Sequence, residues 1–215
     1  MRYQFSVTGT MPLLMHANDI EARDVLDSER KSLKGGKPGD DRSPAHTWKS
    51  YLYISEETGK VCMPFENLLS MLLDGGKKIR IKGKETLKAY TQSILFDRQD
   101  FELMCNGAPI DKATVAAITG DFSEQADAVR QLGFRLQVKP CKVGDKSHVR
   151  VRPIFDNWAV SGEFEVDDAD SQILTLATLT DLWRICGRQI GLGDWRPSSK
   201  KPGQYGRFLA MISRI

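Results

Sequence analysis

The order of strand-like and helix-like segments constrains the fold of this chain more than any single motif does. Residues 2–9 alternate apolar and polar side chains, which is typical of a strand with one buried face. Residues 64–73 begin with Pro and are followed closely by two glycines, which predicts a helix. Residues 170–188 place apolar side chains at helical spacing and form the strongest helix candidate. Helices therefore alternate with strands along the chain.

Shorter segments complete the pattern. A second helix is expected over 85–96. Either Asp170 or Ser171 is expected to cap the long helix near the C-terminus, and Gly187 is expected to end it. Further strands are expected over 61–63, 100–105, 134–138, 149–151, 158–166 and 208–212.

This succession predicts an α+β fold with one mostly antiparallel sheet and helices on one face. The ferredoxin-like, or RRM-like, order β-α-β-β-α-β fits it. The chain has more residues than the six elements of that order require. We therefore expect a single domain over 1–215, with a finger-like insertion at about 18–50 and a second insertion at about 74–130.

The composition fits a globular chain with enough apolar residues for a core. Hydrophobic residues make up 40% and charged residues 27% of the 215 residues. No apolar run approaches the roughly 20 residues that a membrane-spanning helix needs. The N-terminus lacks the apolar region of a signal peptide, so we expect a cytoplasmic protein. The net charge of +3 is only mildly basic, so a polyanionic partner would be recognised through local clusters of charge.

The segment 190–208 carries the clearest functional signal. Its four glycines let the backbone adopt positive φ or approach a ligand closely. Its aromatic rings offer stacking faces, and its basic side chains can pair with phosphate. The residues that we expect to contact a nucleic-acid strand here are Trp195, Arg196, Lys200, Lys201, Tyr205 and Arg207.

A basic run over 77–88 is the second candidate. Apolar and charged side chains alternate in it, which places the charges on one face of a short strand. Phosphate contact is one interpretation, and an edge strand protected by lysines is the other. The candidate phosphate contacts are Lys77, Lys78, Arg80, Lys82 and Lys84.

The polar insertion is the third candidate, because basic and aromatic residues are interleaved there. A single-strand binder uses charge to follow the phosphate backbone and rings to stack on bases. A surface loop anchored to the core by its rings would show the same pattern. The candidate contacts are Lys34, Lys37, Arg42, Trp48, Lys49 and Tyr51.

Basic residues also mark a hairpin predicted within 134–151. They could line a groove, but ordinary surface charge is the simpler interpretation of their pattern. These residues are Lys139, Lys142, Lys146, Arg150 and Arg152.

No residue pattern indicates a catalytic centre. The three histidines lack metal-ligand spacing, and the four cysteines are widely separated, which predicts reduced thiols. We expect no cofactor and no metal ion. The acidic residues within 19–27 leave a metal-dependent nuclease open as an alternative.

Three segments carry a resemblance to a known family. Val7–His16 is a strand followed by a turn of small and apolar residues, and Val61–Leu72 is a strand, a Pro and a helix start. Gly191–Phe208 is a glycine-rich loop before a closing strand. Together they resemble the RAMP superfamily, the RRM-related backbone proteins of CRISPR effector complexes. Gly193–Pro197 also resembles proteins of phages and mobile elements, which favours a stand-alone relative.

The resemblance implies a single strand bound across an RRM-like sheet, with copies of the protein stacked along it. The insertion at about 18–50 would then separate bound bases. We expect a non-catalytic protein that coats single-stranded nucleic acid, preferably DNA, as a homo-oligomer or filament. The alternatives are a CRISPR effector subunit that binds guide RNA, a metal-dependent nuclease and a structural phage protein.

Overall fold

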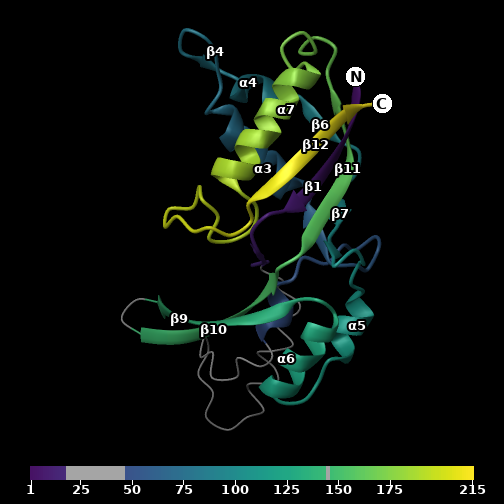
Figure 1. Cartoon of the computed structure of the whole chain (residues 1–215), viewed down its shortest axis with the longest axis vertical. Helices are drawn as coiled ribbons and strands as arrows, with labels where there is room; N and C mark the ends of the chain where they lie inside the picture. Colours follow the sequence, from purple (N-terminus) through teal and green to yellow (C-terminus); the bar gives the residue numbers. More distant parts are fainter. Residues whose placement is uncertain (18–46, 144–145) are drawn as a thin grey trace.

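The computed structural model describes residues 1–17, 47–143 and 146–215 of the chain. It combines antiparallel sheets with a few helices, in an upper and a lower part (Figure 1). The upper part contains the largest sheet and the two long helices that pack on it. The lower part is built around a long hairpin. The prediction of antiparallel sheet combined with helices is confirmed at this level.

The largest sheet is antiparallel throughout. Its strands lie in the order β12 (Phe208–Arg214), β1 (Arg2–Gly9), β11 (Trp158–Val166) and β6 (Ile94–Phe96). A short strand, β8 (Met104–Cys105), also pairs with β11. Because β12 pairs with β1, the two chain ends lie side by side (Figure 1). The strands predicted over 2–9, 158–166 and 208–212 are confirmed.

Two helices pack on one face of this sheet. α3 (Phe65–Gly76) matches the predicted helix that begins after Pro64. α7 (Leu176–Ile185) continues into a π turn, η2 (Cys186–Ile190). The ring of Trp183 in α7 stacks on Phe5 of β1 with centroids 5.0 Å apart, which fixes the helix on the apolar side of the sheet.

The lower part has a three-stranded sheet in the order β2 (Leu13–Leu14), β10 (Lys146–Phe155) and β9 (Arg135–Val143). The predicted hairpin is therefore confirmed, with longer strands. Two helices, α5 (Lys112–Ala117) and α6 (Phe122–Gln131), and a 3-10 turn, η1 (Trp48–Tyr51), accompany it. Two small ribbons pair β3 (Cys62–Pro64) with β7 (Asp100–Glu102), and β4 (Arg80–Lys82) with β5 (Glu85–Thr86).

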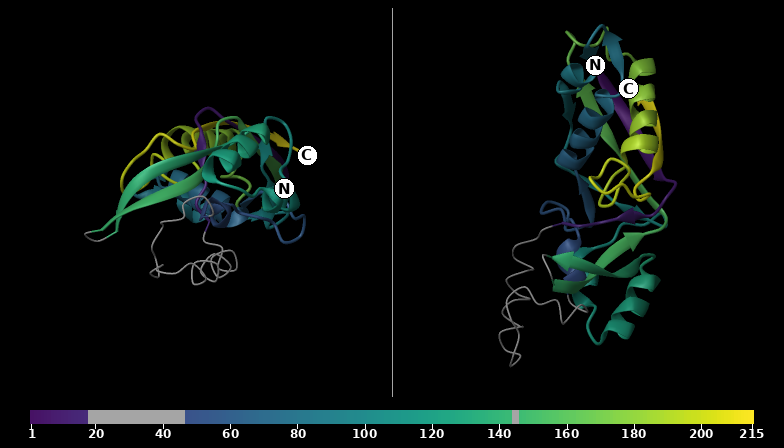
Figure 2. Two further views of the ribbon diagram at one scale, coloured as in Figure 1. Left: turned by 90° about the horizontal axis from the view of Figure 1, so that it is seen from below. Right: turned by 90° about the vertical axis from the view of Figure 1, so that its left-hand side faces the viewer.

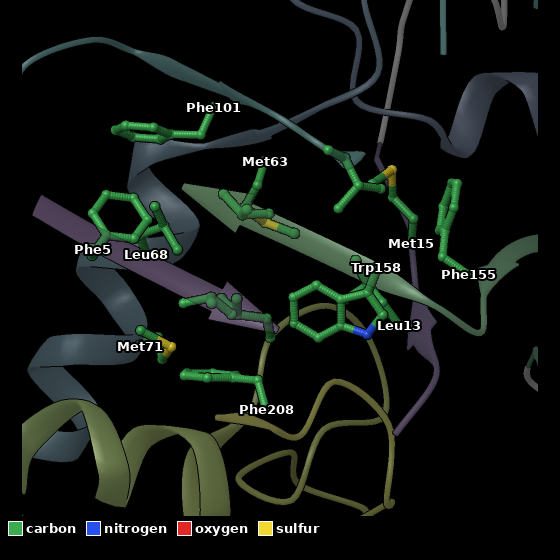
Figure 3. Packing of buried hydrophobic residues seen from close by; sticks show 14 of the residues in the cluster. Phe5, Leu13, Met15, Met63, Leu68, Met71, Phe101, Phe155, Trp158 and Phe208 are labelled. Atoms are coloured by element: carbon green, nitrogen blue, oxygen red, sulfur yellow. The ribbon is translucent and has the colours of Figure 1, made fainter. Parts of the chain in front are cut away.

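Apolar side chains form one continuous core that reaches from the helices of the upper part to the hairpin of the lower part (Figure 3). The thiols of Cys62, Cys105 and Cys186 are buried and free. Burial raises the pKa of Cys105 to about 11 and raises the pKa of the other two thiols further. These three thiols therefore stay neutral and behave as apolar groups of the core.

The last helix begins later than predicted. Thr175 caps it in place of Asp170 or Ser171, and its Oγ1 accepts a hydrogen bond from the N–H three residues on. Gly187 lies within the π turn and does not end the helix. A Cβ at Gly187 would collide with the carbonyl group of Phe208, so this glycine permits close packing of the turn against β12.

Most of the helix predicted over 85–96 is absent from the structure. Only α4 (Lys88–Thr91) is helical, and the residues on either side belong to β5 and β6. β6 pairs with β11, and its Ile94 is buried in the core. Pairing with a strand far away in sequence has overridden the local preference for helix.

Substitution of Gly162 on β11 tests whether this residue lies on the packed face of the strand. A Cβ there would collide with the Phe101 ring and crowd Phe5. We expect Gly162→Ala to lower the free energy of unfolding by about 1–3 kcal/mol through overpacking, as measured by urea denaturation. The exposed neighbour Ser161 provides the control, because Ser161→Ala should change the free energy of unfolding by less than about 0.5 kcal/mol. Equal effects of the two substitutions would contradict the packing.

Candidate functional site

The loop 191–207 joins η2 to β12 and folds against the segment that follows β1. The Leu192 N–H donates to the Gly206 carbonyl oxygen over 3.0 Å, which closes the loop on itself. The Asp194 N–H donates to the Leu14 carbonyl oxygen over 2.8 Å, which ties the loop to β2. Gly193 and Gly206 have positive φ, and a Cβ would collide with the Leu14 carbonyl group at Gly193 and with the Leu192 carbonyl group at Gly206. The glycines therefore let the loop lie close to the lower sheet (Figure 1).

Trp195 is the central side chain of this loop. Its backbone has a φ of 48°, a left-handed conformation that residues other than glycine rarely adopt. Its N–H donates to its neighbour's carboxylate, Oδ1 of Asp194, over 2.9 Å. Its half-buried ring stacks on Tyr205 at a centroid distance of 6.4 Å and an angle of 28°. Strain of this kind costs about 1–3 kcal/mol and is concentrated at functional sites.

The hairpin β9–β10 presents a basic face to this ring. Lys139 lies opposite Arg150 in the strand register, and Gln137 lies opposite Arg152. Because side chains alternate between faces along a strand, all four residues share one face. The Nζ of Lys139 lies 4.7 Å from the centroid of the Trp195 ring.

The same face also holds the two rings in place. The Cζ of Arg152 lies 5.2 Å from the centroid of the Trp195 ring. The Nε2 of Gln137 donates to the Tyr205 hydroxyl over 2.6 Å. Cation–π contacts and this hydrogen bond therefore orient both rings from the hairpin side.

Asp194 connects the loop, the hairpin and the segment after β1. Its Oδ2 accepts a hydrogen bond from Arg152 Nη1 over 2.7 Å and lies 3.3 Å from His16 Nδ1. Burial alone would raise the pKa of Asp194. The hydrogen bond with His16 and the positive charge of Arg152 outweigh burial and hold the pKa below its ordinary value. The carboxylate is therefore ionised and forms an ion pair with the Arg152 guanidinium.

Two hollows flank this ion pair. The smaller is lined by Gln137, Lys139, Pro140, Arg150, Arg152 and Trp195 and is only large enough for a water-sized group. The larger, of about 200 Å³, is polar and is lined by His16, Tyr53, Asn67, Gly193, Asp194 and Arg196. The larger one can receive polar groups, and the smaller one has only cationic side chains among its charged lining residues.

Arg196 and Arg207 from the predicted loop site brace the loop itself. Arg196 Nε donates to Ser198 Oγ over 2.9 Å, and an Nη1 of Arg207 donates to the Arg188 carbonyl oxygen. Lys200 and Lys201 are exposed on the loop surface. The structure therefore brings Trp195 and Tyr205 together as a pair and leaves the two lysines open to solvent.

The basic run of the second candidate forms the β4–β5 ribbon and the turn before it. Lys78, Arg80, Lys82 and Lys84 are exposed. Lys77 is also exposed, but its Nζ forms an ion pair with Asp74 over 2.6 Å. The β4–β5 ribbon lies well apart from the loop 191–207 along the molecule (Figure 1).

The aromatic residues of the third candidate are not available for stacking on a base, which corrects the sequence interpretation. Trp48 is fully buried, and its Nε1 donates to Gln125 Oε1 over 2.8 Å. Tyr51 is buried and packs edge-on against His16. The Nζ of Lys49 donates to the Ile118 carbonyl oxygen over 2.6 Å, which gives it a structural role. The other three candidates, Lys34, Lys37 and Arg42, lie outside the described residues.

The sequence interpretation undervalued the hairpin residues. Lys139, Arg150 and Arg152 were explained as ordinary surface charge, yet two of them contact the Trp195 ring and all three line one hollow. The two-residue spacing of Arg150 and Arg152 on β10 was a visible signal of a shared face. What the sequence lacked was the register of the hairpin and the position of the loop against it.

The open face of the largest sheet lacks stacking rings. Its residues on β1, β11 and β12 are Arg2, Gln4, Ser6, Thr8, Ala159, Ser161, Glu163, Glu165, Leu209, Met211 and Ser213. The single cation among them, Arg2, forms ion pairs with Glu163 and Glu165. RRM domains bind single strands through aromatic rings on such a face. The chemistry for stacking is instead found at the loop.

A scan against protein-family models finds no match for this sequence, and a search among curated proteins finds no similar chain. Within the described ranges, no helix is both long and apolar enough to cross a membrane. The described residues also contain no group of three or more His, Cys, Asp or Glu side chains suited to a metal ion.

Asp194→Ala is expected to lower the free energy of unfolding by about 1–3 kcal/mol, because the buried guanidinium of Arg152 loses its partner. The pKa of Asp194 is lowered in the folded protein. The wild type should therefore be more stable than Asp194→Ala by the full amount at pH values above 3.8, the ordinary pKa of an aspartate. This difference in the free energy of unfolding should disappear as pH falls through the pKa of the folded state. Urea unfolding of both proteins over a pH series measures this difference.

The exposed ion pair between Asp156 and Arg135 provides the matched control. Asp156→Ala should lower the free energy of unfolding by less than about 1 kcal/mol, because exposed ion pairs contribute little. If Asp194→Ala lowers the free energy of unfolding at neutral pH by no more than Asp156→Ala does, the Asp194 ion pair does not support the loop.

Proposed function

We propose that this protein binds single-stranded nucleic acid at the stacked pair of Trp195 and Tyr205, here called the ring platform. One observation carries the proposal. The loop keeps Trp195 partly exposed in a strained backbone conformation, and Lys139 and Arg152 lie at its ring. An unpaired base supplies the flat face that stacks on such a ring, and its phosphates supply the negative charge that the cations attract. In a duplex, neighbouring base pairs already cover that face.

A path for the phosphate backbone extends from the ring platform. Lys200 and Lys201 are exposed on the same loop. The β4–β5 ribbon and the β9–β10 hairpin project from the same side of the molecule as the loop (Figures 1 and 2). A strand that follows this side would meet Lys78, Arg80, Lys82 and Lys84 beyond the ring platform. Backbone contacts of this kind hold the strand without reading its sequence.

We also infer a ferredoxin-like or RRM-like core and a relation to the RAMP superfamily. The strand order β12-β1-β11-β6 supports this inference, as do the positions of α3 between β1 and β6 and of α7 between β11 and β12. Within this core, the ring platform takes the stacking role that the sheet face has in RRM domains. We propose DNA as the preferred ligand and a homo-oligomer that lengthens along the strand.

Trp195→Ala should weaken binding of a labelled single-stranded 30-mer by about 1–3 kcal/mol, which is the contribution of one stacked base. Fluorescence anisotropy over a salt series measures the affinity for single-stranded DNA, single-stranded RNA and duplex DNA. Trp195→Phe keeps a ring and should retain most of the affinity. Met211→Ala, on the open sheet face with 74% of the residue exposed, should leave the affinity unchanged.

The outcomes separate the alternatives. Weaker binding in Met211→Ala with unchanged binding in Trp195→Ala would move the interface to the sheet face. A clear preference for RNA would favour the guide-RNA subunit over the DNA-coating protein. Absence of binding to all three ligands at low salt would refute the proposal and favour a structural protein.

A further inference from the structure

We propose that the small hollow beside the Trp195 ring binds one phosphate group, and that Lys139, Arg150 and Arg152 hold it. We call this hollow the phosphate seat. The inference deepens the proposed function and rests on it, because it assigns the position of one backbone phosphate relative to the stacked base. The ligand class is a phosphate oxyanion, either in the backbone of a strand or as a free ion.

The register of the hairpin gives the first argument. Lys139 and Arg150 lie directly opposite each other on neighbouring strands, and Arg152 lies two residues further along the same face. Like charges placed opposite each other destabilise a sheet. The lining residues of the hollow include no carboxylate that would offset the charge of this pair. A bound anion would remove the repulsion.

The second argument is an unsatisfied donor. The Arg152 side chain is only 9% exposed, and its ion pair with Asp194 engages Nη1. Its Nε is buried and has no hydrogen-bond partner among the described residues. A buried donor without a partner costs about 1–3 kcal/mol, and more when the group is charged. Arg152 lines the hollow, so an anion oxygen there could accept this hydrogen bond.

The size of the hollow decides how much of a ligand enters. It is large enough for about one water-sized group, so a single phosphate oxygen enters it and the rest of the phosphate lies outside. Lys139 is exposed at the rim and Arg150 is half-buried, so both can contact the outer oxygens. A base stacked on Trp195 would then lie next to its own or a neighbouring phosphate.

The salt dependence of binding tests the seat within the full-length protein. The double variant Lys139→Gln with Arg150→Gln should reduce the slope of log affinity against log salt by about 1, because one phosphate contact is lost. Arg152 is left intact because it also supports the loop. Lys112→Gln with Arg130→Gln removes two exposed charges from α5 and α6 and should leave the slope unchanged.

A second measurement detects phosphate binding at the seat in the absence of nucleic acid. In a ¹⁵N-labelled protein, inorganic phosphate should shift the Nε–Hε resonance of Arg152. The Nε of Arg184 already donates to Asp181 Oδ1 over 3.2 Å, so its resonance should not move.

The two measurements distinguish failure of the seat from failure of the proposed function. If the oligonucleotide binds and the double variant keeps the wild-type slope, the seat is refuted and strand binding stands. If no oligonucleotide binds but phosphate shifts only the Arg152 resonance, the seat is supported as a site for a free anion and strand binding is refuted. If phosphate does not shift the Arg152 resonance and the double variant keeps the wild-type salt slope, both measurements refute the seat.

Discussion

The ion pair between Arg152 and Asp194 joins three segments that are far apart in the sequence. Arg152 comes from the hairpin of the lower part, Asp194 from the loop before β12, and His16 from the segment after β1. The Arg152 side chain is almost fully buried, so removal of the Asp194 carboxylate would leave a buried charge unpaired. The position of the Trp195 ring depends on this pair, because Asp194 accepts the Trp195 N–H and Arg152 lies over the ring.

The loop is costly to form, and its contacts with the rest of the protein offset that cost. Trp195 has an unfavourable backbone conformation, and the glycines around it lose conformational freedom on folding. Backbone hydrogen bonds to Leu14 and Pro12, together with the ion pair, hold the loop in place. A packed loop of this kind presents its rings in a fixed orientation, so little conformational entropy would be lost when a ligand stacks on them.

The position of the proposed interface separates this chain from the binding mode that its family resemblance suggested. Stacking on a sheet requires rings that point to the open face, and β1, β11 and β12 place small, polar and aliphatic side chains there. The aromatic residues of these strands point to the core instead, where Phe5 and Phe164 pack with Trp183. The hairpin and loop provide the cations and the rings together, and the two segments meet only in the folded chain.

The sequence by itself determined the elements with strong periodicity, and it singled out the segment 190–208 as the candidate site. Strand alternation in 2–9 and helical spacing after Leu176 arise from burial of one face, and that preference is encoded locally. The sequence also identified Trp195 and Tyr205 as candidate stacking residues, and the structure adds that their rings stack on each other. It could not show that Trp48 is fully buried, because a buried ring and an exposed ring have the same local sequence pattern. Only the tertiary structure decided which basic residues meet the ring, because the ion pair joins Arg152 and Asp194, which are 42 positions apart, and the hairpin register places Lys139 opposite Arg150.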